Sequence, residues 1–273
     1  MLYLVSTPIG NLEDITFRAV NCLKACDYIL CEDTRHSLKL LAHYEIQKPL
    51  ISFHLWNESS REERVISDLQ EGKNIALISD AGTPLFADPG EELVRRCREL
   101  HLPITALPGP CAAICGLTLS GFKTQPFQFV GFLPKKESEL LESLEQLLEY
   151  PGTSICYESP QRIRKSLQAI QSLDPNRKIA LARELTKRFE TILTGTVSAV
   201  LAQEEQEAAL GEIVLLIEGY QKDAEPVFSK DFLRLCVEDY SRTHNCSTKE
   251  AIAFVSTQLN LSKKTVYAAI HIL

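Results

Sequence analysis

Two clusters of ionisable side chains have the composition of an acid–base or phosphate-binding site. One is Glu32-Asp33-Thr34-Arg35-His36 and the other is Arg183-Glu184-Leu185-Thr186-Lys187-Arg188, and each follows a predicted strand. Carboxylate, imidazole and amine groups accept protons in catalysis, so the candidate catalytic residues are Glu32, Asp33, His36, Glu184 and Lys187. Guanidinium groups stay charged and bind phosphate through paired hydrogen bonds, so Arg35, Arg183 and Arg188 are candidate phosphate contacts. Surface ion pairing is the alternative explanation for both clusters.

Three further loops, each containing glycine and proline, follow predicted strands. They span residues 7–16, 79–90 and 107–113. Open α/β sheets bind ligands at the carboxyl ends of their strands, so these loops predict a binding site. The sequence contains neither a G-x-G pair nor a GxxxxGK[ST] run, which excludes the usual dinucleotide and P-loop sites. Structural turns are the alternative for the first and third loops.

The loop with the clearest chemistry is Ser79-Asp80-Ala81-Gly82-Thr83-Pro84-Leu85-Phe86-Ala87-Asp88-Pro89-Gly90. It places the Asp80 carboxylate at the end of a buried strand and follows it with a Gly-Thr-Pro turn, where the backbone is open to a ligand. Prolines at both ends lower the entropy lost when the loop orders. A purely structural turn needs neither feature, so this loop predicts ligand binding.

The elements that carry these loops alternate between short apolar runs and helical patterns, which is typical of a parallel βα sheet. Turn formers at 120–126 predict the end of this first domain, and a second α/β pattern follows. The polar run 219–228 predicts a linker, beyond which three helical patterns are typical of a helix-turn-helix unit or a helical lid. The predicted domains are therefore 1–120, 121–220 and 228–273. The predicted strands are 2–5, 74–79, 104–107, 127–132, 154–157, 178–182 and 211–217, and the segment 17–30 is predicted to be a helix that ends in a further strand. The C-terminal helices are 230–242, 248–258 and 263–272.

Composition indicates a soluble globular protein. Hydrophobic residues make up 45% and charged residues 24% of the 273 residues, a balance unlike that of disordered chains. No run reaches the roughly 20 apolar residues of a membrane-spanning helix, and the N-terminus lacks the features of a signal peptide, so we expect a cytoplasmic protein. The nine cysteines form no CxxC pair, which argues against a zinc or disulfide framework, and we expect no metal site.

Charge is distributed unevenly along the chain. The formal net charge of −7 opposes indiscriminate attraction to nucleic acid. Residues 228–273 hold six Lys or Arg residues and four acids, so this segment has a charge of +2 and the remainder −9. Lysine pairs at Lys135-Lys136 and Lys263-Lys264 add local positive charge. They are candidate contacts to an anionic partner, with a solvated surface as the alternative.

Seven short motifs occur together in a fixed order. They are Thr7-Pro8-Ile9-Gly10-Asn11, Glu32-Asp33-Thr34-Arg35-His36, Ser79-Asp80-Ala81-Gly82-Thr83-Pro84, Asp88-Pro89-Gly90, Tyr157-Glu158-Ser159-Pro160, Ala182-Arg183-Glu184-Leu185-Thr186-Lys187 and Gly211-Glu212-Ile213-Val214. On these motifs the chain resembles the ribosomal RNA small-subunit methyltransferase I family, within the tetrapyrrole-methylase superfamily. The resemblance implies a two-domain α/β fold that binds S-adenosylmethionine in the trough between the domains, with a small C-terminal helical unit. It also implies a homodimer that methylates the ribose 2′-hydroxyl of a cytidine in the decoding region of small-subunit ribosomal RNA, either free or in the assembled subunit.

The same resemblance implies which residues touch the cofactor. They are Ile9, Gly10, Asp80, Gly82, Thr83, Phe86, Cys111, Ala112, Tyr157, Ala182, Glu212 and Ile213. Cys111 departs from the family pattern, which usually has serine after Pro-Gly-Pro. With an RNA substrate, the charged groups named above become candidate RNA contacts: Arg35, Arg183, Arg188, Lys135, Lys136, Lys263 and Lys264. Independently, loops at strand ends without a phosphate signature suit a cofactor that has no phosphate.

Two other functions fit parts of this pattern. A methylase that acts on a small tetrapyrrole would share the fold, but it has no obvious use for a helical unit with Lys263, Lys264 and Tyr267. A non-catalytic RNA-binding protein would be expected to have degraded cofactor loops, whereas all three loops are intact. The function expected is therefore the one that the family resemblance implies, S-adenosylmethionine-dependent methylation of ribosomal RNA.

Overall fold

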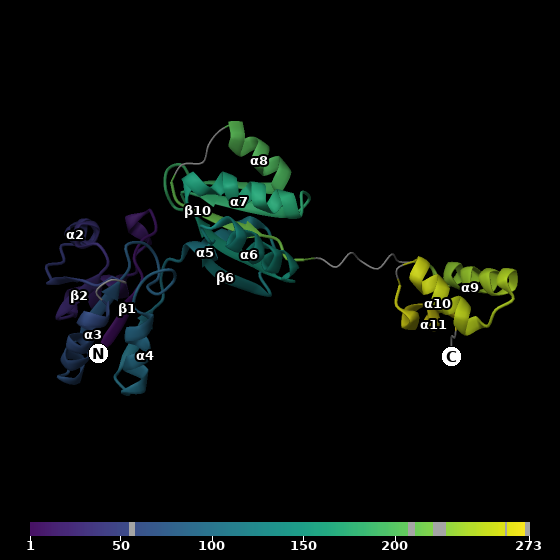
Figure 1. Cartoon of the computed structure of the whole chain (residues 1–273). Coiled ribbons are helices and arrows are strands. Elements are labelled where there is room, and N and C mark those ends of the chain that lie inside the picture. Colours follow the sequence, from purple (N-terminus) through teal and green to yellow (C-terminus); the bar gives the residue numbers. More distant parts are fainter. Residues whose placement is uncertain (55–57, 207–210, 221–227, 260, 271–273) are drawn as a thin grey trace. The chain divides into compact units, whose positions relative to one another are not determined.

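The computed structural model describes residues 1–54, 58–206, 211–220, 228–259 and 261–270. The chain divides into two compact units, Met1–Gly219 and Tyr220–Leu273. The first unit holds two separate five-stranded sheets, and the second is helical (Figure 1).

The first sheet is entirely parallel, as the alternating pattern predicts. Its strand order is β3-β2-β4-β1-β5. All residues of β2 and β4 are buried, because helices cover both faces of a parallel sheet and two hydrophobic clusters form there. The strands are β1 (Leu2–Val5), β2 (Tyr28–Cys31), β3 (Leu50–Ser52), β4 (Ile75–Ile78) and β5 (Ile104–Leu107), and the helices are η1 (Leu12–Asp14), α1 (Phe17–Ala25), α2 (Thr34–His43), α3 (Glu58–Gln70) and α4 (Glu91–Glu99).

The second sheet is mixed, in the order β6-β7-β10-β8-β9. Strands β6 and β7 are parallel, whereas β10 runs antiparallel to β7 and β8, and β9 runs antiparallel to β8. Alternate residues of β10 enter different hydrophobic clusters, because successive side chains of a strand point to opposite faces. The strands are β6 (Phe127–Phe132), β7 (Thr153–Glu158), β8 (Lys178–Arg183), β9 (Thr191–Thr196) and β10 (Ile213–Ile217), and the helices α6 (Glu137–Glu149), α7 (Pro160–Leu173) and α8 (Val197–Gln206) cover one face.

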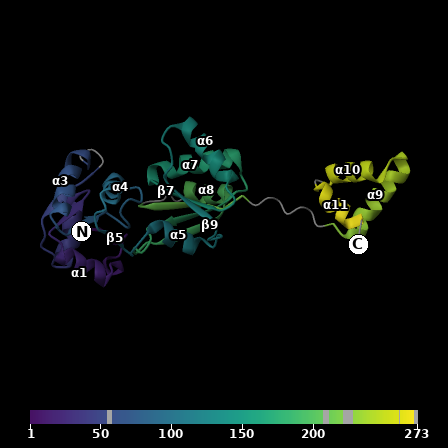
Figure 2. The same cartoon turned by 90° about the horizontal axis from the view of Figure 1, so that it is seen from below.

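Helix α5 (Ala112–Ser120) covers the opposite face of this second sheet (Figure 2). Its buried Ala113 and Leu117 pack with Val214 and Leu216 of β10. The turn formers at 120–126 predict a domain boundary after this helix, but the change from the first sheet to the second comes before it. Apolar packing, which residue spacing does not reveal, determines the sheet to which α5 belongs.

The C-terminal unit contains α9 (Lys230–His244), α10 (Thr248–Gln258) and α11 (Lys263–Ile270) around its own hydrophobic cluster. Ser247 begins α10 with a reciprocal capping box. Ser262 caps α11 in the same way, because its Oγ accepts a 3.0 Å hydrogen bond from the Thr265 backbone N–H. Residues 221–227 of the predicted linker and 271–272 of the last predicted helix lie outside the described residues.

Other features of the described residues concern membranes, cysteines and metals. No helix there is both long and apolar enough to span a bilayer. The cysteines are all free thiols. The same part of the chain contains no group of three or more His, Cys, Asp or Glu side chains arranged to hold a metal ion.

Candidate active site

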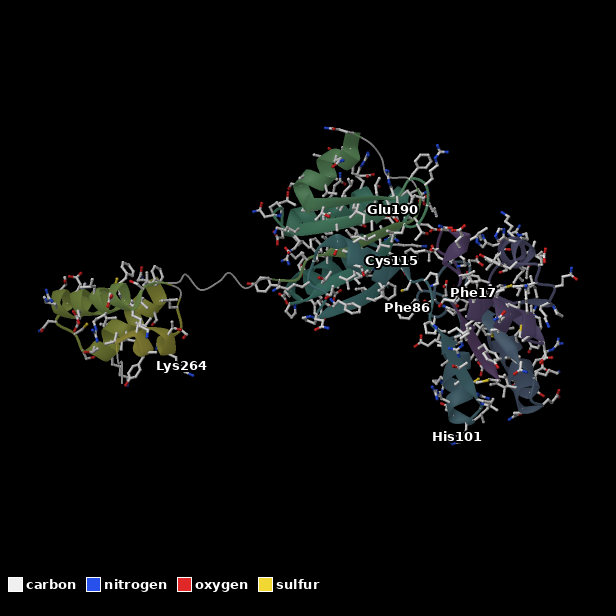
Figure 3. All side chains as sticks on the ribbon, turned by 180° about the vertical axis from the view of Figure 1, so that it is seen from behind. Phe17, Phe86, His101, Cys115, Glu190 and Lys264 are labelled. Atoms are coloured by element: carbon white, nitrogen blue, oxygen red, sulfur yellow. The ribbon has the colours of Figure 1, made fainter. Side chains whose placement is uncertain are left out.

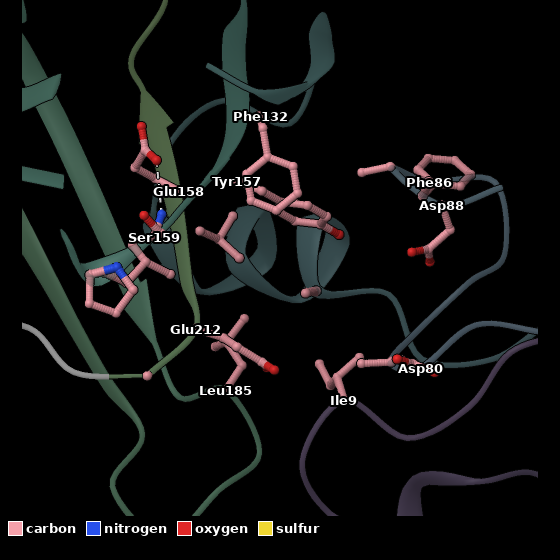
Figure 4. Close-up of a pocket in the computed structure, with 17 residues that line it drawn as sticks. Ile9, Asp80, Phe86, Asp88, Phe132, Tyr157, Glu158, Ser159, Leu185 and Glu212 are labelled. Atoms are coloured by element: carbon pink, nitrogen blue, oxygen red, sulfur yellow. Dashed lines mark hydrogen bonds between the residues drawn. The ribbon is translucent and has the colours of Figure 1, made fainter. Parts of the chain in front are cut away.

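A cavity of about 370 Å³ lies between the loops of the first sheet and one end of the strands of the second sheet (Figure 4). One wall comes from the loop after β1 and the long loop after β4, and the other from the ends of β6, β7 and β10 and the loop after β8. The carboxyl ends of β1 and β4 thus face it, as expected for an open α/β sheet. The lining residues are Ile9, Asp80, Ala81, Phe86, Ala87, Asp88, Ala112, Phe132, Tyr157, Glu158, Ser159, Pro160, Leu185, Gly211, Glu212, Ile213 and Val214.

Aromatic rings connect the two walls. The Phe86 ring centroid lies 5.5 Å from that of Phe129, which lies 4.9 Å from that of Tyr157. Phe132 completes the group, with its ring centroid 5.8 Å from that of Tyr157. Burial raises the pKa of the Tyr157 hydroxyl, so this phenol stays protonated at neutral pH. The rings are tilted or edge-to-face with one another, and the aromatic group gives the cavity an apolar side where a planar ring system can pack.

The charged lining groups are all carboxylates: Asp80, Asp88, Glu158 and Glu212. No Lys, Arg or His occurs among the described residues that line the cavity. Glu158 is buried and accepts hydrogen bonds from Ser159 N–H at 2.9 Å and Ser166 Oγ at 2.7 Å. Asp80 accepts a 3.3 Å hydrogen bond from the Asp33 backbone N–H. Glu158 also pairs with Arg162 at 3.4 Å and Glu212 pairs with Lys187 at 3.3 Å. The negative charge of Asp80 and Asp88 in a partly apolar cavity favours a cationic ligand over a phosphate-bearing one.

Hydrogen bonds between loops hold the Gly82 region in place. Thr7 N–H donates to Gly82 O at 2.9 Å and Gly82 N–H donates to Thr7 O at 3.1 Å. Thr83 Oγ1 donates to Pro110 O at 2.9 Å and lies 3.1 Å from Ser6 Oγ. These bonds join all three of the predicted loops. Gly82 and Thr83, which the family resemblance implies as cofactor contacts, therefore fix the wall of the cavity and do not line it.

The implied cofactor contacts divide into two groups. Ile9, Asp80, Phe86, Ala112, Tyr157, Glu212 and Ile213 line the cavity, whereas Gly10, Gly82, Thr83, Cys111 and Ala182 do not. Ala182 is fully buried in the cluster beneath α5. Gly10 faces the loop after β8, where an added Cβ would lie 2.9 Å from Leu185 O. Cys111 is the N-cap residue of α5, and its side chain makes no capping hydrogen bond.

Replacing this cap with the residue usual in the family should stabilise the protein. We expect Cys111→Ser to raise the free energy of unfolding by about 0.5–1 kcal/mol, because a serine hydroxyl accepts a hydrogen bond from the first helical turn. Urea unfolding measures the change. The control is Cys22→Ser, also a half-buried cysteine but inside α1, which should give no gain. Equal stability of Cys111→Ser and the unmodified chain would contradict the capping argument.

The second predicted catalytic cluster is occupied by ion pairs. Lys187 Nζ donates to Glu184 Oε1 at 2.9 Å and to Glu212 Oε2 at 3.3 Å. Glu184 Oε1 also accepts from the Glu212 backbone N–H at 2.9 Å. Hydrogen bonds from Lys187 and Glu212 lower the pKa of Glu184, and its carboxylate partners raise that of Lys187 against the effect of burial. A carboxylate with a lowered pKa and a protonated amine are both poor proton acceptors.

The residues of the first predicted cluster have different surroundings in the structure. Asp33 caps α2 and pairs with Arg35 at 2.9 Å, and this pairing lowers the pKa of Asp33 to about 2. The ion-pair alternative therefore describes Asp33 and Arg35. Burial and the nearby Asp80 raise the pKa of Glu32. His36 lines a separate hollow of about 230 Å³, which shares Asp80 with the main cavity.

The remaining predicted RNA contacts lie outside the cavity. Arg183 Nε donates to Thr191 Oγ1 at 3.0 Å, and the Arg188 guanidinium lies 5.5 Å from the Phe189 ring centroid. Lys135 and Lys136 are exposed, and Lys136 pairs with Glu139 at 3.1 Å. Lys263 and Lys264 line a groove in the C-terminal unit together with Thr248, Lys249, Ile252, Ala253 and Tyr267.

Sequence reasoning missed several residues of the cavity, of which Asp88 and Phe132 carry the most chemistry. The Asp88-Pro89-Gly90 motif is visible in the sequence, but its direction depends on how the preceding loop turns back. That loop places Leu85 and Ala87 at φ values of 72° and 67°, a conformation that a sequence pattern does not predict for these residue types. Phe132 ends the edge strand β6, and the sequence does not show that this strand pairs with β7.

Comparisons identify the class of protein that this fold and cavity define. A family model described as Tetrapyrrole (Corrin/Porphyrin) Methylases matches residues 1–201. The solved structure of a cobalt precorrin-4 methyltransferase, a cobalamin biosynthetic enzyme, aligns with a TM-score of 0.59 at 15% identity, covering 80% of this chain and 94% of that one. A uroporphyrin-III-C-methyltransferase from Thermus thermophilus aligns with a TM-score of 0.56 at 18% identity, covering 80% and 93%. The expected tetrapyrrole-methylase fold class is confirmed.

Two curated relatives indicate one family within this class. A protein of Bacillus subtilis is 40% identical over 275 residues, covering 100% of this chain and 94% of the relative. A protein of Escherichia coli O157:H7 is 47% identical over 227 residues, covering 82% and 79%. Each is named Ribosomal RNA small subunit methyltransferase I. The chain belongs to the ribosomal RNA small subunit methyltransferase I family, and its cofactor is S-adenosylmethionine.

The residues of the cavity fit this cofactor. S-adenosylmethionine carries a sulfonium, an ammonium and one carboxylate group but no phosphate, and its net positive charge agrees with a lining whose charged groups are carboxylates. The volume of about 370 Å³ lies within the range of roughly 300–1,000 Å³ for small-molecule sites. With the cofactor in this cavity, Phe86, Phe132 and Tyr157 would supply apolar contact for the adenine, and Asp80 and Asp88 would supply negative charge for the cationic groups.

Proposed function

We propose that this chain transfers the methyl group of S-adenosylmethionine to the ribose 2′-hydroxyl of a cytidine in the decoding region of small-subunit ribosomal RNA. The names of the relatives support a ribosomal RNA substrate. The observation that carries the methyl-transfer part is the acidic and aromatic cavity between the two sheets. The choice of a cytidine 2′-hydroxyl rests on the motif resemblance.

S-adenosylmethionine supplies an electrophilic methyl group on a positively charged sulfur, so the protein must chiefly align a hydroxyl oxygen with that methyl. Alignment of this kind contributes about 7–11 kcal/mol to lowering a barrier. The aromatic group and the loops joined at Gly82 hold the walls of the cavity for this purpose. A positioned base adds about 10²–10⁴-fold.

Among the candidate bases, Glu32 and His36 have the better placement. Ion pairs keep the carboxylates of Asp33 and Glu184 ionised and keep the amine of Lys187 protonated. None of these three groups is a good proton acceptor in that state. Glu32 lies near Asp80, and the raised pKa of its carboxylate suits proton acceptance. His36 shares a hollow with Asp80, so both candidates lie beside the same edge of the cavity.

The groove in the C-terminal unit supports an RNA partner. It has a volume of about 610 Å³ and receives Lys249 from the first turn of α10 and Lys263 and Lys264 from the first turn of α11. Helix N-termini favour anions, and Tyr267 offers a ring for base stacking. The Lys264 side chain points away from the helices into solvent (Figure 3).

Removing the three lysines of this groove should weaken RNA binding. For the variant Lys249→Gln, Lys263→Gln, Lys264→Gln we expect about a tenfold loss of affinity and a salt slope lower by about 2, from about 0.7 per phosphate contact. The control removes Lys230 and Arg242, exposed charges on α9 of the same unit. Salt-titrated binding to one ribosomal RNA fragment measures both variants. If the control variant weakens RNA binding equally, the overall positive charge of the unit explains the effect, and the groove is not a specific binding site.

We also propose that the functional form is a homodimer, as the family resemblance implies, and sedimentation equilibrium tests it.

The decisive experiment for the function uses S-adenosylmethionine labelled in its methyl group. Purified protein is incubated with small subunits, with free small-subunit ribosomal RNA or with uroporphyrinogen, and the products are digested and separated by mass. The proposal expects label in 2′-O-methylcytidine from one of the RNA substrates. Label in a tetrapyrrole or in a base-methylated nucleoside would refute it, and RNA binding without any label would indicate a non-catalytic protein.

A further inference from the structure

Asp88 occupies a defined position on the first-sheet wall of the cavity. It ends the loop after β4, and the next two residues, Pro89 and Gly90, are buried ahead of α4. Gly90 has a φ of 117°, and an added Cβ there would collide with Leu77 of β4, so the backbone that carries Asp88 is tightly packed. The Asp88 carboxylate points into the open space of the cavity, between Phe86 and Asp80 (Figure 4).

The groups that face Asp88 from the neighbouring elements carry no positive charge. Asp80 and Ser79 lie at the end of β4, Glu32 comes from the loop after β2, and Tyr157 comes from β7. The Ser79 hydroxyl, which donates to Gly82 O at 2.8 Å, also lies close enough to Asp88 to favour its ionised form, and the nearby His54 partly offsets the raised pKa of Glu32. By contrast, Glu212 on the opposite wall is paired with Lys187. Asp88 is therefore a lining carboxylate beside like charges, with no cation of the protein near it among the described lining residues.

We propose that the Asp88 carboxylate is the counter-charge of the sulfonium group of S-adenosylmethionine and makes the cavity bind the donor more tightly than the demethylated product. This inference rests on the proposed position of the cofactor in the cavity and not on the RNA substrate. Methyl transfer breaks the sulfur–methyl bond and forms a bond between the methyl carbon and the acceptor oxygen, whose proton is released. The electron pair of the broken bond stays on sulfur, and the sulfonium becomes a neutral thioether. The product S-adenosylhomocysteine therefore lacks the charge that Asp88 faces, and its release is favoured.

Proton linkage gives this inference a distinct signature. Burial and the charges of Glu32 and Asp80 raise the pKa of Asp88 to about 7. A bound sulfonium favours the carboxylate and lowers this pKa, so donor binding releases a proton wherever free Asp88 is protonated. Donor affinity should consequently be full above pH 8 and fall up to about tenfold per pH unit below pH 7. Product affinity should change much less over the same range.

Calorimetry with donor and product, at pH values from 6 to 8.5, tests the proposal. Asp88→Asn should weaken donor binding about 10–100-fold at pH 8, as expected for a lost interaction with a charged group, and should leave product binding nearly unchanged. Asp88→Glu should restore most of the difference. Titrations at pH 7 in buffers of different ionisation enthalpy should show release of about half a proton with the donor and much less with the product.

Glu212→Gln is the comparison variant, because its carboxylate also lines the cavity but shares the ammonium group of Lys187 with Glu184. It should change the donor-to-product ratio less than Asp88→Asn does. If Asp88→Asn weakens both ligands equally, Asp88 is a neutral contact and the proposal fails. If it alters neither ligand while Gly82→Leu abolishes binding, the cofactor occupies the cavity and only the role of Asp88 is refuted. If neither substitution affects the donor, the position of the cofactor is refuted as well.

Discussion

Gly82→Leu should reduce the affinity for S-adenosylmethionine by about 100-fold or more, while the protein remains folded. Gly82 has a φ of 86° and exchanges two backbone hydrogen bonds with Thr7. A side chain in this conformation costs about 1–3 kcal/mol, and its Cβ would lie 3.2 Å from Ile9 Cγ2 and 3.6 Å from Pro110 O. A leucine must therefore push Ile9 into the cavity or separate the loops, and about 3 kcal/mol corresponds to about 100-fold in affinity.

Gly72→Leu separates this effect from general backbone strain. Gly72 has a φ of 88°, but an added Cβ would have no atom within 4 Å. Both variants therefore carry a similar conformational penalty, and only the first disturbs the cavity. Calorimetry measures cofactor affinity, and thermal unfolding followed by circular dichroism measures stability. Equal cofactor affinity in the two variants would remove the loop after β4 from the site.

The parts of the fold that depend on local patterns could be predicted from the sequence. The apolar run at 75–78 is long enough for one strand and has no polar face, which indicates a strand buried on both sides, and β4 is buried throughout. The helix pattern at 248–258 agrees with α10 because Ser247 and Glu250 supply a recognisable capping box. Strand β9 was not predicted, because its edge position leaves Thr191, Thr194 and Thr196 only partly buried or exposed.

The chemistry of the site was predictable only in part. Asp80 could be placed at the cavity because it directly follows a buried strand. Glu184 and Lys187 have the composition of a proton-transfer pair, but the sequence does not show that Glu212, just before β10, joins them in an ion-pair network. Asp88 was not predicted as a lining residue, again because its surroundings are set by the fold. The fold brings Glu32 from the loop after β2 and Asp80 from the start of its own loop close to the Asp88 carboxylate.

Ending the chain after Gly219 should separate cofactor binding from RNA methylation. The cavity is lined within Met1–Gly219, and the C-terminal unit has its own hydrophobic cluster. The truncated protein should therefore bind S-adenosylmethionine within about twofold of the full chain. Its kcat/KM for ribosomal RNA should fall by about 100-fold or more, because the +2 segment at 228–273 and the lysine groove are lost, and Met1–Gly219 alone carries −8.

The form of this loss distinguishes two roles for the C-terminal unit. If the unit only adds affinity, kcat should recover at saturating RNA, and the full chain without Lys249, Lys263 and Lys264 should show a smaller change of the same kind. If the unit also orients the RNA, kcat should stay low at saturation, since aligning the ribose hydroxyl with the methyl group lowers the barrier. Methylation of small subunits by the truncated protein at the full rate would contradict both roles. The basic groove would then be a solvated surface, and RNA recognition would have to lie in Met1–Gly219, where Lys135 is exposed next to the β6 end of the cavity.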